Sequence, residues 1–401
     1  PIKSSAASDV YKRQELVKGS LNTFLNAMTY PDKTVYPIAS CNDTDFQNLM
    51  DVYMDAVFHP NIGKEKKIFM QEGWHYELES EDAPITYNGV VYNEMKGAFS
   101  SPDGVLDRMI LNSLFPDTTY ANESGGDPDV IPELTYEEYL NFHRTYYHPS
   151  NSYIYLYGNM DMEEKLNWLD QEYLSAYDRK EVDSEIHLQK PFEQMHDITK
   201  PYSIASNEST EDNTYLSYNM VVGEAADINL SLAFEVLDYA LLSAPGAPLK
   251  QALLDAKIGK DIYGSFEDGI KQTYFSIVAK GANLSRKEEF IKVIRDTLTK
   301  IAEEGIDKKA VTAGINYYEF RFREADFSSY PKGLMYGLDI LSSWLYDDTK
   351  PFCEVQLLEG FEFLKKALEE GYFEELIRKY LLGNTHGAIL SLVPELSLIH
   401  I

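Results

Sequence analysis

The chain contains 401 residues, a length that corresponds to about two or three domains. Its hydrophobic content of 44% and its charged content of 25% are ordinary for a soluble globular protein, and no apolar run approaches the ~20 residues that a membrane-spanning helix needs. The net charge of -29 argues against a nucleic-acid-binding protein, because phosphate contacts require clustered lysine and arginine.

The acidity itself leaves two interpretations open. It could attract basic peptides by long-range steering, or it could serve only to keep the protein soluble. The cysteine content is more restrictive. Cys41 and Cys353 are the only two cysteines and lie far apart in the sequence, which argues against a disulfide framework and is typical of a reducing compartment. We therefore expect a bacterial cytoplasmic protein, with the mitochondrial matrix as the alternative.

The first element predicted from the local sequence pattern is a helix. Residues 1–14 are expected to be a non-native tail, as are residues 396–401, and both are left out of the fold prediction. Thr44 and Gln47 form a capping-box pattern, which predicts a helix start at Thr44. His59-Pro60 ends this helix. One face of it is apolar and carries Phe46, Leu49, Met50, Tyr53, Met54 and Val57.

A second capping box, Thr135 with Glu138, predicts another helix. Residues 152–157 follow it as a β-rich run, and a Gly-Asn turn then leads into a further helix. The polar residues 191–213 are the expected linker between two domains. The first domain would then comprise residues 15–190.

The later part of the chain repeats this order of helix, strand, turn and helix. Alternation predicts strands at residues 215–222, 274–279 and 388–393, and residues 230–242 show helical periodicity. Ser285 with Glu288 predicts the cap of another helix. The repeated unit predicts an α+β protein of two similar domains, each a mixed, mainly antiparallel sheet packed against helices, with residues 214–395 as the second domain.

Several segments in order resemble one family. The run GVVYNEMKGAFSSP at residues 89–102 resembles the segment that carries the third zinc ligand in presequence-protease-like members of the insulinase (pitrilysin) family of metallopeptidases. Further blocks resemble the same family at residues 20–32, 124–135, 142–151 and 323–334. The resemblance covers roughly residues 16–395 and implies the metallopeptidase (LuxS/insulinase-like) architecture.

The resemblance implies a zinc site that this sequence does not complete. Members of the family are inverzincins, whose other two ligands and general base come from an H-x-x-E-H motif. None of the eight histidines lies in such a motif, and H-E-x-x-H is absent as well. We therefore expect Glu94 to be a metal ligand for Zn²⁺ in an incomplete site, with no catalytic residue in this chain. The loss of the motif is expected to reflect either truncation or evolution.

A substrate role is expected for a short strand near the N-terminus. Asn26, Ala27 and Thr29 resemble the edge strand on which family members bind a peptide as an added strand. His143 and His148 are five residues apart, point to different faces of a helix, and are expected to be structural. Gly125-Gly126 lacks the Lys-Ser/Thr of a phosphate-binding loop.

The resemblance thus implies the N-terminal half of a zinc metalloendopeptidase that degrades unfolded peptides in a closed chamber, and without the H-x-x-E-H motif this chain is expected to be inactive as it stands. The expected partners are such peptides, with basic ones as one option, and the C-terminal half of the same polypeptide. Neither nucleic acid nor a membrane span is expected. The alternative is a non-catalytic relative that keeps the fold as a scaffold.

Overall fold

The computed structural model describes residues 21–396, which form two compact units. Unit 1 consists of residues 21–99, 122–186 and 327–338, and unit 2 of residues 100–121, 187–326 and 339–396. Because these units are interleaved along the sequence, the boundary expected at residues 191–213 stays a prediction.

Unit 1 is built from short strand pairs and helices. β1 pairs with β4, β2 with β3, and β5 with β6, all antiparallel. Its strands and helices are β1 (Asn22–Leu25), β2 (Met28–Thr29), β3 (Thr34–Val35), β4 (Ile38–Ser40), α2 (Asp43–Phe58), α3 (Lys66–Glu72), β5 (His75–Glu77), β6 (Thr86–Asn88), α4 (Val90–Ala98), α6 (Tyr136–Tyr146), α7 (Met162–Glu172) and the first half of α12 (Lys332–Trp344).

The helices predicted in unit 1 fit the structure in part. The capping box of Thr135 and Glu138 opens α6, as predicted. The helix α2 ends at Phe58, before His59-Pro60. Its predicted start at Thr44 is wrong, because the side chain of Asn42 accepts the Asp45 backbone N–H at 2.9 Å and caps the helix. Asparagine is as effective an N-cap as serine or threonine.

The strand predicted at residues 152–157 is also wrong, since no strand is assigned there. Its aromatic residues pack on a helix instead. A Cβ atom placed on Gly337 would lie 2.8 Å from the Tyr155 ring, and one on Gly333 would lie 2.3 Å from the Tyr157 ring. The two glycines of α12 are four residues apart, so they lie on one face of the helix and leave room for both rings.

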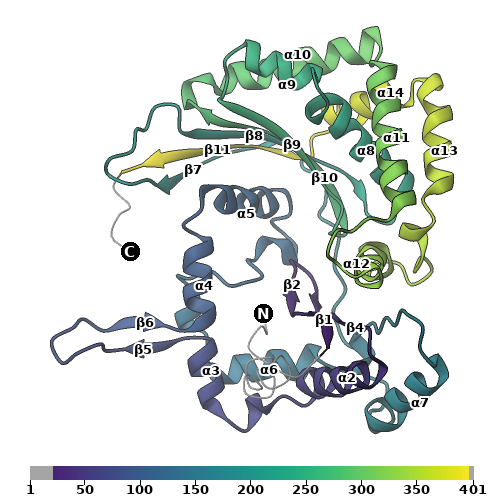
Figure 1. Cartoon of the computed structure of the whole chain (residues 1–401). Coiled ribbons are helices and arrows are strands. Elements are labelled where there is room, and N and C mark those ends of the chain that lie inside the picture. Colours follow the sequence, from purple (N-terminus) through teal and green to yellow (C-terminus); the bar gives the residue numbers. More distant parts are fainter. Residues whose placement is uncertain (1–20, 397–401) are drawn as a thin grey trace. The chain divides into compact units, whose positions relative to one another are not determined.

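Unit 2 contains a five-stranded sheet in the order β7-β11-β8-β10-β9 (Figure 1). β7 and β11 are parallel and all other neighbours are antiparallel, which confirms the predicted mixed, mainly antiparallel sheet and the α+β class. The elements are α5 (Pro102–Leu114), β7 (His196–Ser203), β8 (Thr214–Glu224), α8 (Ile228–Asp238), α9 (Pro248–Asp255), β9 (Asp261–Glu267), β10 (Gln272–Ala282), α10 (Lys287–Glu304), α11 (Lys308–Glu324), the end of α12, α13 (Leu358–Ala367), α14 (Tyr372–Leu376) and β11 (Gly387–Glu395).

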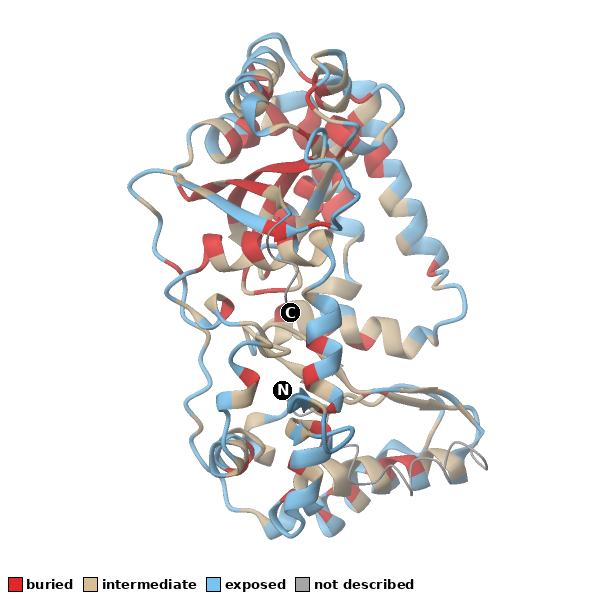
Figure 2. Ribbon diagram, turned by 90° about the vertical axis from the view of Figure 1, so that its left-hand side faces the viewer, coloured by how far each residue is buried: buried red, intermediate tan, exposed pale blue. Residues whose placement is uncertain are grey.

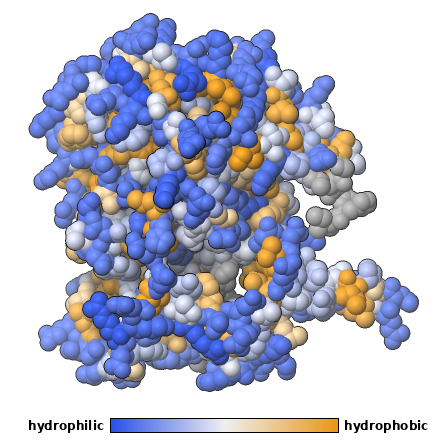
Figure 3. Space-filling model, turned by 180° about the vertical axis from the view of Figure 1, so that it is seen from behind, coloured by the Kyte–Doolittle hydropathy of each residue, from blue (hydrophilic) through white to orange (hydrophobic). Residues whose placement is uncertain are grey.

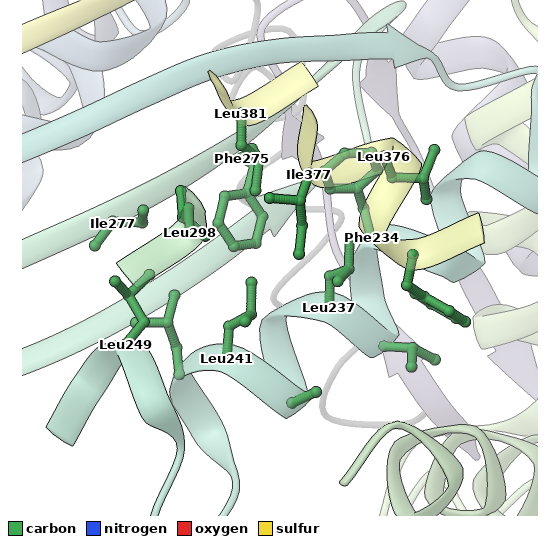
Figure 4. Close-up of a cluster of buried hydrophobic side chains, with 14 of the residues drawn as sticks. Phe234, Leu237, Leu241, Leu249, Phe275, Ile277, Leu298, Leu376, Ile377 and Leu381 are labelled. Atoms are coloured by element: carbon green, nitrogen blue, oxygen red, sulfur yellow. The ribbon is translucent and has the colours of Figure 1, made fainter. Parts of the chain in front are cut away.

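The main hydrophobic core lies between this sheet and its helices (Figure 4). Leu216, Tyr218, Met220 and Val222 alternate along β8 and belong to the core, as the predicted strand required. Phe234 of α8 is fully buried, and Figure 2 shows that buried residues gather in the sheet and on the inner sides of the helices. The predicted Ser285 cap is wrong, since α10 begins at Lys287 with no side-chain cap.

The opposite face of the sheet is covered by α5 (Figure 1). Leu106, Met109, Ile110 and Leu114 of this helix are buried. The Lys280 ammonium of β10 lies 2.9 Å from the Asp103 carboxylate at the start of α5, and this contact raises the pKa of Lys280.

None of the helices among residues 21–396 is long and apolar enough to span a membrane.

Candidate functional site

The helix that carries Glu94 starts at a glycine that no other residue can replace without strain. Gly89 has φ of 155°, and a Cβ atom there would lie 2.2 Å from the carbonyl oxygen of Gly73. The same oxygen accepts the Tyr92 backbone N–H at 3.4 Å. The first turn of α4 is therefore fixed against the end of α3 by a close backbone crossing.

One side of α4 packs against a loop that also contains glycines. Tyr92 and Met95 are buried with Ile131. A Cβ atom on Gly125 would lie 2.3 Å from the Met95 sulfur, and Gly126 has φ of 92°. Gly125-Gly126 therefore lets the loop lie close against the buried side of α4.

Asn88 fixes the first turn of α4 through its side chain. Its Oδ1 accepts the Gly89 backbone N–H at 2.7 Å and the Asn93 side-chain amide at 2.7 Å. Its own amide donates to the carboxylate of Glu77 on the neighbouring strand. Tyr92 and Met95 point inward, and Glu94, which lies between them in the sequence, is exposed to solvent. The structure thus presents one carboxylate on a rigidly placed helix.

The predicted substrate segment lies in the part of unit 1 formed by β1 to β4. Asn26 and Ala27 connect β1 to β2 and are not themselves in a strand. The Asn26 backbone N–H donates to the Pro37 carbonyl at 3.2 Å, and the Ala27 N–H donates to the Asn26 side chain at 2.9 Å. Thr29 is in β2, opposite Thr34 of β3. The substrate role of these residues stays a prediction.

The two histidines near α6 have structural contacts, as expected. His143 lies with its Nε2 3.0 Å from the Val57 carbonyl oxygen, and its ring stacks on Tyr147. Burial lowers the pKa of His143. The Nδ1 of His148 accepts the Ser150 backbone N–H at 3.1 Å. The His143 ring therefore joins α6 to the end of α2, and the His148 ring caps the short turn at Pro149–Asn151.

The residues that the structure describes do not fit a zinc site by themselves. Catalytic zinc normally has three protein ligands and an open position. Within residues 21–396, no three His, Cys, Asp or Glu side chains are grouped so that they could hold a metal ion. Glu94 would thus need donors from outside these residues, and no metal-dependent step can be derived from them.

Unit 2 contains a group of acidic side chains that the sequence did not reveal. Burial, together with the nearby charges of Asp268 and Glu354, raises the pKa of Glu235 on α8 to about 8. Burial also raises the pKa of Glu354 to about 8. The only sequence sign was a glutamate within the apolar run LSLAFEVLDYALL. Because these carboxyl groups are protonated more readily in the folded state, they make the stability of the fold depend on pH.

Comparison with known families shows similarity to members of one peptidase family. Residues 133–318 match the family model described as "Peptidase M16 inactive domain". The protein HypA of Clostridium perfringens is 54% identical over 95% of this chain and 39% of its own length. Presequence protease 1 of Arabidopsis thaliana, named chloroplastic/mitochondrial, is 41% identical over 95% of this chain and 36% of its own length. The chain therefore spans less than two fifths of the length of these relatives.

Solved structures agree on the fold. A protease from Helicobacter pylori superimposes with a TM-score of 0.70 at 16% identity, over 95% of this chain and 84% of that one. The first half of the periplasmic protease PqqL from Escherichia coli gives a TM-score of 0.64 at 14% identity, over 96% of this chain and 78% of that one. At these identities the likeness concerns the fold alone.

Proposed function

Because this chain belongs to the M16 peptidase family, as the resemblance implied, we propose that it is the zinc-site half of a metalloendopeptidase that degrades unfolded peptides. The observation that carries this proposal is the placement of Glu94. Glycines at positions 89 and 125 and the buried Tyr92 and Met95 hold its helix in place, while its carboxylate remains exposed.

Glu94 has the chemistry that the proposal needs. Carboxylate oxygen is one of the three donor types that zinc accepts in proteins, together with imidazole nitrogen and thiolate sulfur. A catalytic ligand must also be held in one geometry by its surroundings. The Asn88 side chain supplies this by binding the start of α4. In the longer protein, Glu94 would be one of three ligands, and the other two would come from outside this chain.

The segment of Asn26, Ala27 and Thr29 is proposed to bind the peptide backbone. Strand addition gives affinity through main-chain hydrogen bonds without requiring a particular sequence, which suits an enzyme that accepts varied peptides. The rest of the longer polypeptide is proposed to close a chamber around the substrate. The compartment stays a prediction, because the relatives are named from bacteria as well as from mitochondria and chloroplasts.

A scaffold without activity is the second candidate. The description of the matching family model contains the word "inactive", and that match covers residues 133–318. This range excludes α4 and Glu94, so the word does not bear on the proposed ligand. We therefore favour the peptidase.

The experiment uses the longer protein that contains this chain. Glu94→Gln keeps the shape of the side chain and removes its charge, so hydrolysis of an unstructured peptide should fall by at least about a hundredfold, as expected for loss of a metal ligand. Glu163→Gln, at an exposed glutamate of α7 in the same unit, is the matched control and should keep full activity. Full activity in Glu94→Gln, or activity that survives a chelator, would contradict the proposal.

A further inference from the structure

The hairpin formed by β5 and β6 has one apolar face. Tyr76 pairs directly with Tyr87, and the flanking pairs are His75 with Asn88 and Glu77 with Thr86. Because side chains alternate between the two faces of a strand, the two tyrosines share one face and both flanking pairs lie on the other. By the same alternation, Leu78 and Ile85, one residue beyond the paired strands, continue the tyrosine face. We call Tyr76, Leu78, Ile85 and Tyr87 the hairpin stripe.

The hairpin stripe is exposed. Tyr76 is 66% exposed, Leu78 55%, Ile85 68% and Tyr87 44%. In Figure 1 the hairpin stands away from α3 and α4, and Figure 3 shows an apolar patch on it with a hydrophilic tip. Single exposed apolar residues are normal, but a contiguous apolar face on a projecting element indicates a binding surface.

Aromatic contacts join the stripe to the helix of Glu94. The rings of Tyr76 and Tyr87 are 5.4 Å apart, and Trp74 lies 5.5 Å from Tyr76. At the base of the hairpin, the ring of Tyr87 lies 5.9 Å from that of Tyr92, a buried residue of α4. The Trp74 indole N–H donates to the Leu134 carbonyl at 3.0 Å. The stripe is thus a fixed surface that begins at α4 and runs outward.

The hairpin segment carries acidic side chains and neither lysine nor arginine. Residues 73–89 include Glu77, Glu79, Glu81 and Asp82 and contain no lysine or arginine. The last three lie at the tip and are exposed. An acidic rim around an apolar face favours a partner with both apolar and basic side chains and disfavours an acidic one.

The backbone of the hairpin can accept a further strand. Within the described part of the chain, β5 and β6 form a two-stranded sheet without a third strand. Such a hairpin is only marginally stable on its own in water, and pairing with a third strand would stabilise it. An extended peptide added at one edge would place alternate side chains on the stripe and direct others toward the acidic rim.

We propose that the β5–β6 hairpin is a docking surface for extended basic peptides that carry apolar residues, and that these are substrates of the longer enzyme. The identification of the partner as a substrate rests on the proposed function, whereas the binding itself needs neither zinc nor Glu94. A failure of the zinc-site proposal would therefore leave peptide binding intact, and a failure of peptide binding would leave the zinc site intact.

The test is fluorescence anisotropy with this 401-residue chain and a short labelled peptide that alternates lysine or arginine with leucine. A second peptide has glutamate at every basic position. The basic peptide should bind more tightly, and its affinity should fall as salt approaches 0.15 M, where the Debye length is ~8 Å. The double variant Tyr76→Thr with Tyr87→Thr keeps strand-forming residues. It should bind the basic peptide at least about tenfold more weakly, as expected for the loss of aromatic anchors.

Two further variants separate apolar from charge effects. Phe320→Ala removes an aromatic residue that is 64% exposed on α11, and it should leave binding unchanged. Neutralising the tip with Glu79→Gln, Glu81→Gln and Asp82→Asn should weaken binding and abolish most of its salt dependence.

Hydrogen exchange on the unmodified chain keeps the proposal testable if a variant fails to fold. The basic peptide should slow amide exchange in residues 73–89. Equal binding of both peptides, or unchanged exchange in this segment, would overturn the proposal. So would a stripe-dependent dimer of the chain that persists when the basic peptide is in excess, because a second copy would then be the occupant.

Discussion

Replacing Glu235 with glutamine should make the stability of the protein less dependent on pH. Glu235 lies on α8, and burial raises the pKa of its carboxyl from 4.5 to about 8. The carboxylates of Asp268 and Glu354 act in the same direction, while Arg321 opposes them. The folded state therefore favours the protonated carboxyl, whereas the unfolded chain ionises at an ordinary pKa.

The sign of the effect follows from this difference. Below about pH 4.5 the carboxyl is protonated in both states and costs the fold nothing. As the pH rises toward about 8, the unfolded chain releases its proton first, so stability falls. A shift of about 3.5 units at about 1.4 kcal/mol per unit sets an upper limit of about 5 kcal/mol. Since Glu354 has its pKa raised as well, the two carboxyls titrate together, and we expect Glu235→Gln to recover about 2–4 kcal/mol at alkaline pH.

The assay is urea unfolding at about pH 4 and about pH 9, which bracket the expected titration. The unmodified chain should lose stability between these values, and Glu235→Gln should lose clearly less. Glu303→Gln, at an exposed position on α10, is the control and should behave like the unmodified chain. If Glu235→Gln loses as much stability with pH as the control does, the environment assigned to Glu235 is wrong.

Three further predictions concern packing, the start of α4 and activity. Phe234→Ala should lower the free energy of unfolding by about 3–5 kcal/mol in denaturant titrations, since its ring is fully buried against Phe266 and Phe275, and a loss below about 1 kcal/mol would contradict this. Gly89→Ala should destabilise the protein by more than about 1 kcal/mol, because its Cβ would collide with the Gly73 carbonyl. Gly97→Ala, where a Cβ would meet nothing within 4 Å, should stabilise it slightly. Equal effects of the two substitutions in thermal melts would refute the close contact between the backbones of Gly89 and Gly73. This 401-residue chain should not cleave unstructured peptides with or without added zinc, and chelator-sensitive cleavage by it would disprove that.

The fold of unit 2 was predictable where local pattern decides structure. The alternation along β8 placed Leu216 and Tyr218 on the core side of the sheet. The same alternation put Ser217 and Asn219 on the other face, which is buried too. Asn219 tolerates this burial because its amide donates to Ser217 at 2.8 Å and to the Ala388 carbonyl at 3.0 Å. The cover on that face is α5, more than a hundred residues away in sequence, and no local pattern reports such a contact.

The candidate site was predictable only through resemblance. Nothing in the local pattern distinguishes Glu94 from an ordinary exposed helix glutamate. The structure adds the physical reasons for its flanking residues: Gly89 is required by the Gly73 carbonyl, and Gly125 by Met95. The acidic group around Glu235 escaped prediction because its members come from segments far apart in the sequence: α8, the turn between β9 and β10, α12 and the segment before α13.

The central claim, that Glu94 is a zinc ligand, is tested most directly by locating the metal. Crystals of the longer protein, measured on both sides of the zinc absorption edge, should show an anomalous peak about 2.0–2.2 Å from a carboxylate oxygen of Glu94. The peak should be lost or strongly reduced in Glu94→Gln and retained in Glu163→Gln. A fully occupied zinc ion bound elsewhere, with the Glu94 carboxylate in solvent, would contradict the account.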